Sequence, residues 1–594
     1  MPQFSLSQKV RALGRLRTNE HTTMTLLAVL VGLTGGYGAV GFRFLIDFFQ
    51  TLSFGAGGEL LTLAQATPWY LRLIIPAAGG LIVGPILYLL ANEAKGHGVP
   101  EVMESVALRS GMIRKRVVLV KSFVSAICIG TGGSVGREGP IVQIGSAIGS
   151  SIGQLLRISA DRIRTLVGCG AAAGIAATFN APIAGAMFAL EIVLGDFGLA
   201  TFSPIVISAV VATAVSRHFL GNTPAFLVPE YKLISAWELP LYMALGILCA
   251  FVAVGFTKSL YRLEDGFEHL RLPSYLKAGI GGLILGGIAI PFPYVLGVGY
   301  GSIDMALLEH LSWPLMMGLV AFKLLATSIT LGSGGSGGIF APSLFIGAMT
   351  GGVFGTLCHA LFPGITASPG AYSIVGMGAV VAGTTHGPLS AILILFELTG
   401  DYKIILPLMI ACIMSSMGAR QLLRDSIYTL KLARRGINIY EGKEVNVLKS
   451  IRVGDVMNPD VEVIPEYLTL GTLTDKLSRS KYNTFPVVND KGELSGILSL
   501  LDYRDIAFDQ NLKDLVVAKE LATPKVVTVS LDDNLWDAFQ KISRDDFSIL
   551  PVVSSDIPSR LVGVLTRRDI IGVYQKAVMK KALLTPEKEA SKGS

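Results

Sequence analysis

A charged pentapeptide, residues 136–140, lies inside strongly apolar sequence and holds the side chains best suited to ion chemistry. An ionised carboxylate at membrane depth is costly unless it is paired or faces water, so Glu138 is a functional candidate by default. The proline that ends the pentapeptide suits the first turn of a helix. Such a helix would aim its free N–H groups at Arg137, Glu138 and Gly139 and form an anion site there. The other interpretation is a short polar loop in which Arg137 pairs with Glu138.

The composition is that of a membrane protein. Of the 594 residues, 51% are hydrophobic and only 16% are charged, whereas soluble domains average about 25% charged residues. The five cysteines lie in apolar runs without paired spacing, and the seven histidines show no ligand spacing. We therefore expect neither a disulfide framework nor a metal site. Basic residues that flank membrane spans explain the net charge of +7, so no nucleic-acid partner is expected.

The chain divides into a membrane region, a soluble region and two polar ends. We expect residues 1–21 to be a basic cytoplasmic segment and the Lys/Glu-rich tail, 581–594, to be disordered. The membrane region is predicted to cover residues 22–435, with long spans at 22–49 and 69–91. The apolar pieces that follow are short and interrupted by glycine and proline. Uniform spans of about 20 residues therefore describe only part of this region.

The membrane region repeats itself. Residues 134–149 align with residues 336–351 at a constant offset of 202, and serine, proline, isoleucine and three glycines coincide. A second match joins Pro182–Glu191 to Pro388–Glu397. We therefore expect two homologous halves, about 24–220 and 240–435. Broken helices at corresponding positions of two halves predict a substrate site near the membrane midplane, with helix N-termini facing an anion.

The soluble region, beyond Arg434, alternates β-branched strands with amphipathic helices and also repeats. We expect two α/β modules, at 445–515 and 516–580. In each module a strand ends in a hydroxyl residue that an aspartate follows three positions later; the pairs are Ser499 with Asp502 and Thr566 with Asp569. Such an aspartate caps a helix, or it holds a ribose diol, as an acidic residue does in nucleotide-binding folds.

These motifs resemble a known family. The pentapeptide 136–140, the segment 337–342, the two Pro-to-Glu segments and Tyr428 are similar to the CLC family of chloride channels and proton/chloride exchangers. The soluble region resembles a tandem pair of CBS domains. The resemblance implies a polytopic α-helical membrane protein, an inverted repeat of about eighteen tilted helices with a cytoplasmic α/β CBS pair. It also implies a homodimer in the lipid bilayer. We expect the inner membrane of a prokaryotic cell, with the N-terminus and the CBS domains in the cytoplasm.

The resemblance also assigns roles to residues. Glu138 falls on the gating glutamate, whose carboxylate occupies an anion site when ionised and swings away when protonated. Tyr428 falls on the tyrosine whose hydroxyl points at the central chloride, and the amides of Ile339 and Phe340 match the backbone donors there. Lys121 matches a lysine that raises the positive potential near the pathway. Taken alone, Tyr428 also fits an interfacial aromatic belt, and Lys121 fits a snorkelling lysine at the end of a span.

Two positions depart from the family pattern. His97 stands where the family's serine donates to the central anion. The imidazole either donates one N–H to the ion or rotates away and leaves the amide of Gly98 to bind it. Ile192 stands in the slot of the inner proton glutamate of many exchangers. Channels carry an apolar residue there, but some exchangers lack the glutamate and still move protons.

Three classes of function follow: a proton-coupled chloride exchanger, which we favour, a passive gated chloride channel, and a nucleotide sensor that the membrane part merely anchors. An enzyme is not expected, because the sequence has no nucleophile–base set, metal cluster or phosphate loop.

No cofactor is obligatory. We expect ATP, ADP or AMP between the CBS modules, with Asp502 and Asp569 on ribose and Ser499 and Thr566 near phosphate. The choice among chloride, other halides and nitrate stays open.

Overall fold

The structure is a computed structural model that describes residues 20–90, 96–222, 226, 234–400, 402–437, 448, 451–480, 482–504, 506, 512–524, 526–544, 547–557 and 559–573. The predicted tail, 581–594, and all but two residues of the predicted N-terminal segment, 1–21, lie outside these ranges. The contacts between residues divide the chain into two compact units, 1–437 and 438–594. Each unit is described by itself.

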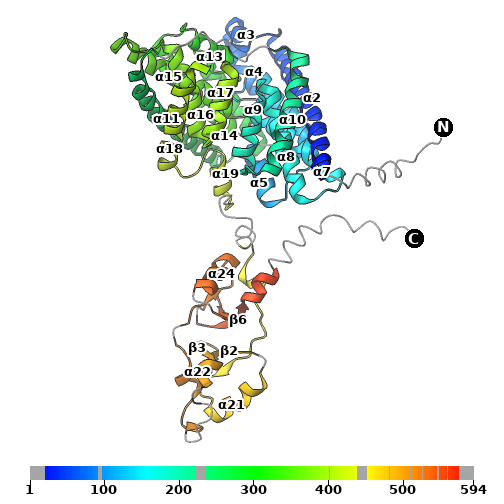
Figure 1. The fold of residues 1–594 in the computed structure, drawn as a ribbon, viewed down its shortest axis with the longest axis vertical. Coiled ribbons are helices and arrows are strands. Elements are labelled where there is room, and N and C mark those ends of the chain that lie inside the picture. The colour runs from blue at the N-terminus through cyan, green and yellow to red at the C-terminus, as the bar shows by residue number, and fades with distance from the viewer. Residues whose placement is uncertain are drawn as a thin grey trace, which may run out of the picture. The chain divides into compact units, whose positions relative to one another are not determined.

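The first unit is helical (Figure 1). The α-helices of its second part, α11 to α18, follow the order of α2 and α4 to α10 in its first part. The elements of the first part are α2 (Glu20–Phe54), α3 (Leu60–Ala66), α4 (Trp69–Leu90), α5 (Val99–Leu108), α6 (Arg116–Gly130), α7 (Glu138–Leu155), α8 (Ala160–Phe179), α9 (Pro182–Phe188), the π-helix η2 (Ala189–Leu194) and α10 (Leu199–Leu220). The elements of the second part are η3 (Ala236–Glu238), α11 (Leu239–His269), α12 (Ser274–Ala289), η4 (Pro293–Val295), α13 (Tyr300–Leu307), α14 (Trp313–Gly332), α15 (Phe340–Leu361), α16 (Pro369–Thr385), α17 (Pro388–Thr399), η5 (Tyr402–Ile404) and α18 (Ile405–Leu422). A last helix, α19 (Thr429–Arg434), follows.

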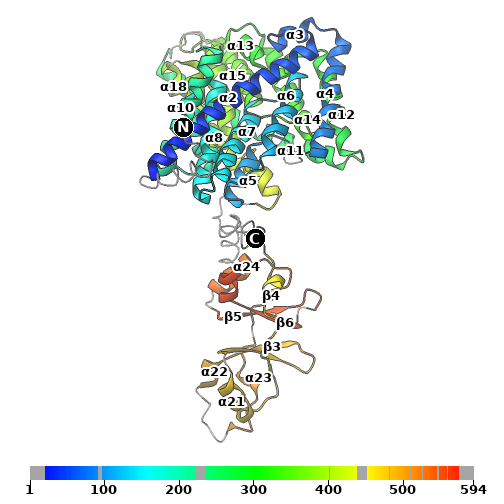
Figure 2. The ribbon, with the colours of Figure 1, turned by 90° about the vertical axis from the view of Figure 1, so that its right-hand side faces the viewer.

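Corresponding helices of the two parts make corresponding contacts. Helix α7 packs on α8, as α15 packs on α16, and α10 packs on α2, as α18 packs on α11. The two parts meet where counterparts touch each other, α4 against α12 and α9 against α17. In Figure 2, α2 runs diagonally across the unit and α4 lies beside α12. The packing therefore follows the repeat that the sequence shows.

Seven helical segments within the described residues are long and apolar enough to cross a membrane. They are Thr22–Phe54, Trp69–Leu89, Leu199–Leu220, Ala236–His269, Trp313–Gly332, Phe340–Leu361 and Tyr402–Leu422. The first two agree with the predicted long spans. Three shorter apolar helical segments, Pro182–Leu194, Ser274–Ala289 and Pro388–Thr399, agree with the expectation of broken spans of uneven length.

Glycines let the central helices of each half approach closely. A Cβ atom on Gly145 of α7 would lie 2.1 Å from the carbonyl oxygen of Gly170 on α8. A Cβ atom on Gly347 of α15 would lie 2.3 Å from the carbonyl oxygen of Gly376 on α16. Small residues at such crossings allow two backbones to pack against each other inside a membrane.

We expect Gly347→Val to prevent normal packing of α15 on α16, because the new side chain meets backbone that cannot move aside. Overpacking typically costs about 1–3 kcal/mol, and a clash with backbone belongs at the upper end or beyond. Gly287→Val is the matched control, because a Cβ atom at Gly287 has no neighbour within 4 Å. Size-exclusion chromatography and thermal unfolding of the two purified variants measure the difference. Equal behaviour of the two variants would contradict the close crossing.

The second unit contains two similar three-stranded sheets with parallel and antiparallel pairs. In the first sheet, β1 (Ile464–Pro465) pairs in parallel with β2 (Thr484–Val488), which pairs antiparallel with β3 (Leu494–Ser499). In the second, β4 (Val529–Ser530), β5 (Ile549–Val553) and β6 (Leu561–Thr566) pair in the same way. The labelled helical elements are η6 (Val453–Asp455), α21 (Leu470–Arg479), α22 (Leu500–Arg504), α23 (Ala518–Leu521) and α24 (Leu535–Arg544), and the described residues 567–573 are helical as well. Each sheet has its own hydrophobic core.

Each sheet also receives a residue from the segment that precedes the other sheet. Asn458 and Val564 of β6 exchange two backbone hydrogen bonds of 2.9 and 3.0 Å. Thr523 and Ile497 of β3 exchange two of 2.8 and 3.1 Å. The two modules therefore exchange one backbone pairing each, and the predicted boundary between residues 515 and 516 stays a prediction.

Candidate functional site

Three glycine-rich loops of the first unit meet, and a helix starts at the end of each. Gly136 and Gly338 exchange two backbone hydrogen bonds, of 2.7 and 2.6 Å. The amide of Gly96 donates to the carbonyl of Gly335 at 3.2 Å, and that of Gly337 donates to Gly96 at 3.4 Å. Helices α5, α7 and α15 begin directly after these loops. Since the first N–H groups of a helix lack partners within it, the loops bring three sets of free donors together.

Two of the predicted anion-site glycines permit this close meeting. A Cβ atom on Gly139 would lie 2.1 Å from the carbonyl oxygen of His97 and 3.0 Å from the Cα atom of Gly338. Gly98 has a φ of +86°, and a Cβ atom on it would lie 2.9 Å from the carbonyl oxygen of Gly139. Side chains at either position would force the loops apart, so glycine is required at both positions.

Glu138, the first residue of α7, lies at this meeting point and is 1% exposed. Its Oε1 atom accepts a hydrogen bond of 2.9 Å from the hydroxyl of Tyr300. Within the described part of the chain its Oε2 atom has no hydrogen-bond partner, and a Cβ atom on Gly136 would touch it. The guanidinium of Arg137 lies over the ring of Tyr300, 5.2 Å from its centroid. The alternative interpretation was a short polar loop in which Arg137 pairs with Glu138, whereas here both side chains contact Tyr300.

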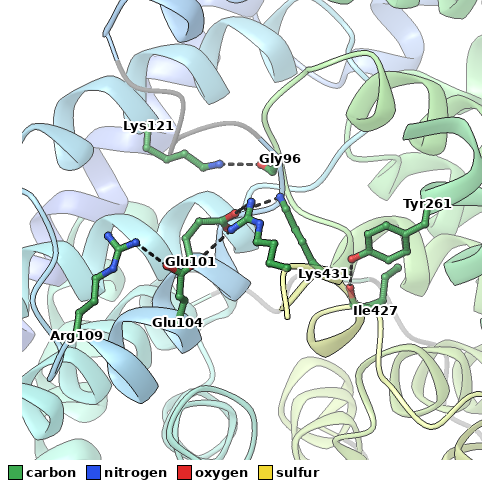
Figure 3. Close-up of polar contacts among 9 residues, drawn as sticks. Gly96, Glu101, Glu104, Arg109, Lys121, Tyr261, Ile427 and Lys431 are labelled. Carbon is green, nitrogen blue, oxygen red and sulfur yellow. Dashed lines mark hydrogen bonds and ion pairs between the residues drawn. The ribbon is translucent and has the colours of Figure 1, made fainter. Parts of the chain in front are cut away.

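Tyr428 and His97 lie side by side. Their ring centroids are 5.8 Å apart, and both residues are buried. The hydroxyl of Tyr261 donates to the carbonyl of Ile427 at 2.6 Å, which fixes the chain just before Tyr428 (Figure 3). Within the described residues Nδ1 of His97 has no hydrogen-bond partner. The imidazole therefore keeps one ring nitrogen available, as a direct contact with an ion would require.

Ile339 and Phe340 stand at the start of α15 and are each 1% exposed. The ring of Phe340 packs against Phe179, with centroids 5.6 Å apart, and against Phe188, with centroids 6.3 Å apart. This packing holds the first turn of α15 in place. The amides at this turn belong to the group of helix N-termini that the three loops bring together.

Lys121, on α6, is completely buried, and its Nζ atom donates to the carbonyl of Gly96 at 2.8 Å (Figure 3). The lysine thus lies beside the loop that contains His97, and the electrostatic role that the resemblance implied stays a prediction. A network of ion pairs lies nearby: Lys431 Nζ is 3.1 Å from Glu101 Oε1, and Arg435 reaches both Glu101 and Glu104. Sequence reasoning missed this network, because α5 and α19 lie far apart in the chain; only the i, i+3 spacing of the two glutamates on α5 hinted at a charged face.

Ile192 lies in η2 and is 6% exposed. A Cβ atom on Gly387 would lie 2.8 Å from the Cδ1 atom of Ile192, so the side chain packs against the loop before α17. The π-helical turn was not predicted, because nothing in the sequence distinguishes it from a continuation of α9. Short π-helical turns occur frequently at functional sites.

The aspartates of the two α/β modules cap helices. Oδ2 of Asp502 accepts from the amide of Ser499 at 3.1 Å, and the amide of Asp502 donates back to the hydroxyl of Ser499 at 3.3 Å. Asp569 and Thr566 make the same pair of bonds, at 3.0 and 3.1 Å, and the hydroxyl of Thr566 also donates to Asp569 at 2.6 Å. The capping interpretation is therefore correct for both aspartates. Within the described residues of this unit, no hydrogen bond to the other carboxylate oxygen, Oδ1, is seen in either aspartate.

A helical membrane unit with two repeated parts, broken helices around a buried glutamate, and an appended pair of α/β modules together define a class of ion-transport protein. A family model for voltage-gated chloride channels matches residues 79–420, and a CBS-domain model matches residues 453–508 and 518–576. The chain belongs to the CLC family of chloride-transport proteins and carries two CBS domains. The predicted fold class is thereby confirmed.

Relatives within the family carry names of both functional kinds. A putative ClcB-like chloride channel protein of Ralstonia nicotianae is 39% identical over 69% of this chain and 97% of its own length. The H+/Cl− exchange transporter ClcA of Vibrio campbellii is 32% identical over 69% of this chain and 88% of its own length. The solved structure of a slow cyanobacterial Cl−/H+ antiporter matches with a TM-score of 0.63 and 27% identity, over 69% of this chain and 97% of that chain.

Proposed function

We propose that this protein exchanges chloride for protons and that Glu138 serves both ions. The observation that carries the proposal is the placement of this carboxylate, buried among three helix N-termini with one oxygen unpaired within the described residues. In its ionised form it is an anion at an anion site, and it competes there with chloride. In its neutral form it carries a proton and leaves the site to chloride. One residue thus handles the two ions alternately.

Exchange requires that protons reach Glu138. Position 192 holds isoleucine, so the protons must arrive without a carboxylate relay at that position. Protons hop along hydrogen-bonded water without a titratable relay, so a thread of water past Ile192 is sufficient. Ile192 sits on a π-helical turn, whose widened geometry commonly accompanies functional sites. We therefore expect the loss of the relay to slow proton delivery only modestly.

The reversal potential under a pH gradient tests the proposal. Purified protein is placed in liposomes with equal chloride on both sides and an imposed pH difference. The reversal potential of an exchanger moves with the pH gradient, because each cycle carries protons as well as chloride. A reversal potential that stays at the chloride value contradicts the proposal.

A passive gated chloride channel is the second candidate, and the apolar side chain of Ile192 favours it. In a channel, protonation of Glu138 would open the pathway without stoichiometric proton movement. Chloride flux would then depend on pH while the reversal potential stayed at the chloride value. The same liposome experiment therefore decides between the two candidates.

We also propose that an adenine nucleotide, ATP, ADP or AMP, binds at the CBS domains. The oxygen of Asp502 and of Asp569 that does not cap a helix is available for ribose hydroxyls, and Ser499 and Thr566 stand beside them near the proposed phosphates. Because the side-chain oxygen of asparagine can accept the hydrogen bond from the amide of Ser499 as the carboxylate does, Asp502→Asn should leave the fold intact. It should weaken binding about tenfold if its module holds the ribose, since hydrogen bonds to charged groups contribute about 1.5–3 kcal/mol.

Calorimetry on the full-length protein measures this binding. Asp569→Asn tests the second module in the same way, and Asp514→Asn, which changes an exposed aspartate elsewhere in the unit, is the control. Absence of heat with all three nucleotides from folded wild-type protein would exclude adenine nucleotides as ligands.

Assembly and orientation complete the proposal. We infer a homodimer in the inner membrane of a prokaryotic cell, with the N-terminus and the CBS domains on the cytoplasmic side. The basic residues that precede the first span support this orientation. Cross-linking in native membranes tests the dimer, and protease access to the CBS domains in inside-out vesicles tests the orientation.

A further inference from the structure

A second glycine loop, residues 297–299, has in the second half the place that residues 96–98 have in the first. The outer glycines of the first loop have φ angles of +81° and +86°, and those of the second have φ angles of +58° and +90°. A short helix starts directly after each loop, α5 after the first and α13 after the second. The two loops therefore turn the chain into a helix with the same left-handed glycine geometry.

A buried lysine holds each loop. Lys121 donates to the carbonyl of Gly96 at 2.8 Å, and Lys323 donates to the carbonyl of Gly297, also at 2.8 Å. Both lysines are 0% exposed, and they are separated by the offset of 202 that relates the two repeated motifs. The second loop is therefore the structural counterpart of the loop that places His97 beside the anion site.

Tyr300, the first residue after the second loop, is the side chain that this loop places on Glu138. Its hydroxyl donates to Oε1 of Glu138 at 2.9 Å. Its ring is held on two sides, by the guanidinium of Arg137 at 5.2 Å and by the ring of Phe226 at 5.3 Å in an edge-on contact. A tyrosine fixed in this way presents its hydroxyl in one position. The carboxylate of Glu138 keeps this hydrogen bond only while it stays in its present position.

Tyr300 also lines two cavities, of about 370 and 180 Å³. Arg43 and Arg137 line both cavities together with Tyr300. The tyrosine thus donates to Glu138 and lines two cavities that it shares with two arginines. A carboxylate that leaves its present position on this side must first give up the hydrogen bond with Tyr300.

We propose that Tyr300 is a positioning residue that holds the ionised carboxylate of Glu138 in the anion pathway, and that release of this hydrogen bond accompanies protonation of Glu138. The inference rests on the proposed role of Glu138. It adds the residue that sets the equilibrium between the ionised and the protonated form of Glu138. An ionised carboxylate accepts a stronger hydrogen bond than a neutral one does. Tyr300 therefore favours the state in which the ionised carboxylate of Glu138 occupies the anion pathway.

The other charged and titratable groups that face this site are few among the described residues. Arg137 lies over the ring of Tyr300, Tyr428 lies beside His97 at the start of α19, and Arg43 of α2 lines both cavities with Arg137. A change from tyrosine to phenylalanine at position 300 leaves all of them in place. It also keeps the ring that Arg137 and Phe226 contact.

Tyr300→Phe is therefore the test, with the chloride flux of reconstituted protein measured against pH. Without the donor the ionised carboxylate is less stable, so Glu138 takes up a proton at lower proton concentration. We expect the pH of half-maximal flux to rise by about one unit, which is the tenfold change that loss of one such hydrogen bond produces. Tyr294→Phe, which changes another tyrosine lining the larger cavity, should leave the profile unchanged. A pH profile equal to that of the wild type would overturn the assignment of Tyr300.

The double variant separates this inference from the proposed function. If Tyr300 acts through Glu138, Tyr300→Phe should have no effect on the pH profile in a Glu138→Gln background. A shift that persists in this background means that Tyr300 acts elsewhere, and it overturns the inference. If instead Glu138→Gln itself leaves proton movement intact, the proposed function fails, whatever Tyr300→Phe does.

Discussion

Glu138→Gln is expected to abolish proton movement completely while chloride still passes. The amide has nearly the shape of the protonated carboxylate, so the fold around the three loops should persist. It cannot take up or release a proton, and it carries no charge with which to compete for the anion site. In liposomes, a chloride gradient should therefore drive chloride flux without changing the internal pH. This is the largest functional effect that we expect from a single substitution.

Glu101→Gln provides a comparison for this prediction. Glu101 is another glutamate at the start of a helix near the site, with a side chain only 11% exposed, but its carboxylate is paired with Lys431 at 3.1 Å. Its loss should disturb the ion-pair network and leave proton coupling in place. Vesicles with Glu138→Gln protein that still acidify or alkalinise in response to a chloride gradient would remove Glu138 from the mechanism.

The centre of the site was predictable because it consists of short, contiguous motifs. Residues 136–140 and 337–342 carry their glycines, charge and proline within a few positions, and the offset of 202 relates them. Backbone geometry alone then brings the helix N-termini together. The capping pairs of the CBS domains were predictable for the same reason, since an aspartate three residues after a hydroxyl is a local signal.

The contacts that modulate the site were not predicted, because they join residues that are distant in sequence and belong to no motif. Tyr300 meets Glu138 across 162 positions, and Tyr300 lies in an ordinary apolar stretch. The signal was nevertheless present. The offset that relates the two repeated motifs also relates Lys121 to Lys323, and the glycine loop before each short helix recurs. A comparison of whole loops between the two halves, and not only of identical residues, would have identified residues 297–300.

The sequence repeat relates two glutamates, Glu191 and Glu397. In the structure each of them accepts hydrogen bonds from the first amides of a helix in the other half. Glu191 accepts from the amides of Leu389 and Ser390, at 3.2 and 2.7 Å, where α17 begins. Glu397 accepts from the amides of Ile183 and Ala184, at 3.1 and 2.7 Å, where α9 begins. Each half therefore supplies a carboxylate that caps a helix of the other half. The two caps join the halves at their contact between α9 and α17.

Glu191→Gln is expected to cause the largest loss of stability among the polar substitutions considered. A glutamine can offer an acceptor to one amide only, and its NH2 group then faces another donor. Because a hydrogen bond to a charged group contributes about 1.5–3 kcal/mol, and Glu191 also accepts from the hydroxyl of Ser390 at 2.6 Å, we expect a loss of roughly 2–4 kcal/mol. Glu397→Gln, which lacks a third partner in the described residues, should cost less.

Thermal unfolding of the purified variants measures these losses, with Glu268→Gln as the control, because Glu268 is an exposed glutamate at the end of α11. Function should separate the two caps further. Ile192 follows Glu191 directly and packs against the loop that Glu191 fixes, whereas Glu397 caps a helix on the other side of the contact. Glu191→Gln should therefore slow proton-coupled flux more than Glu397→Gln does at a temperature where both proteins remain folded. Unfolding temperatures equal to that of Glu268→Gln would show that neither carboxylate joins the halves.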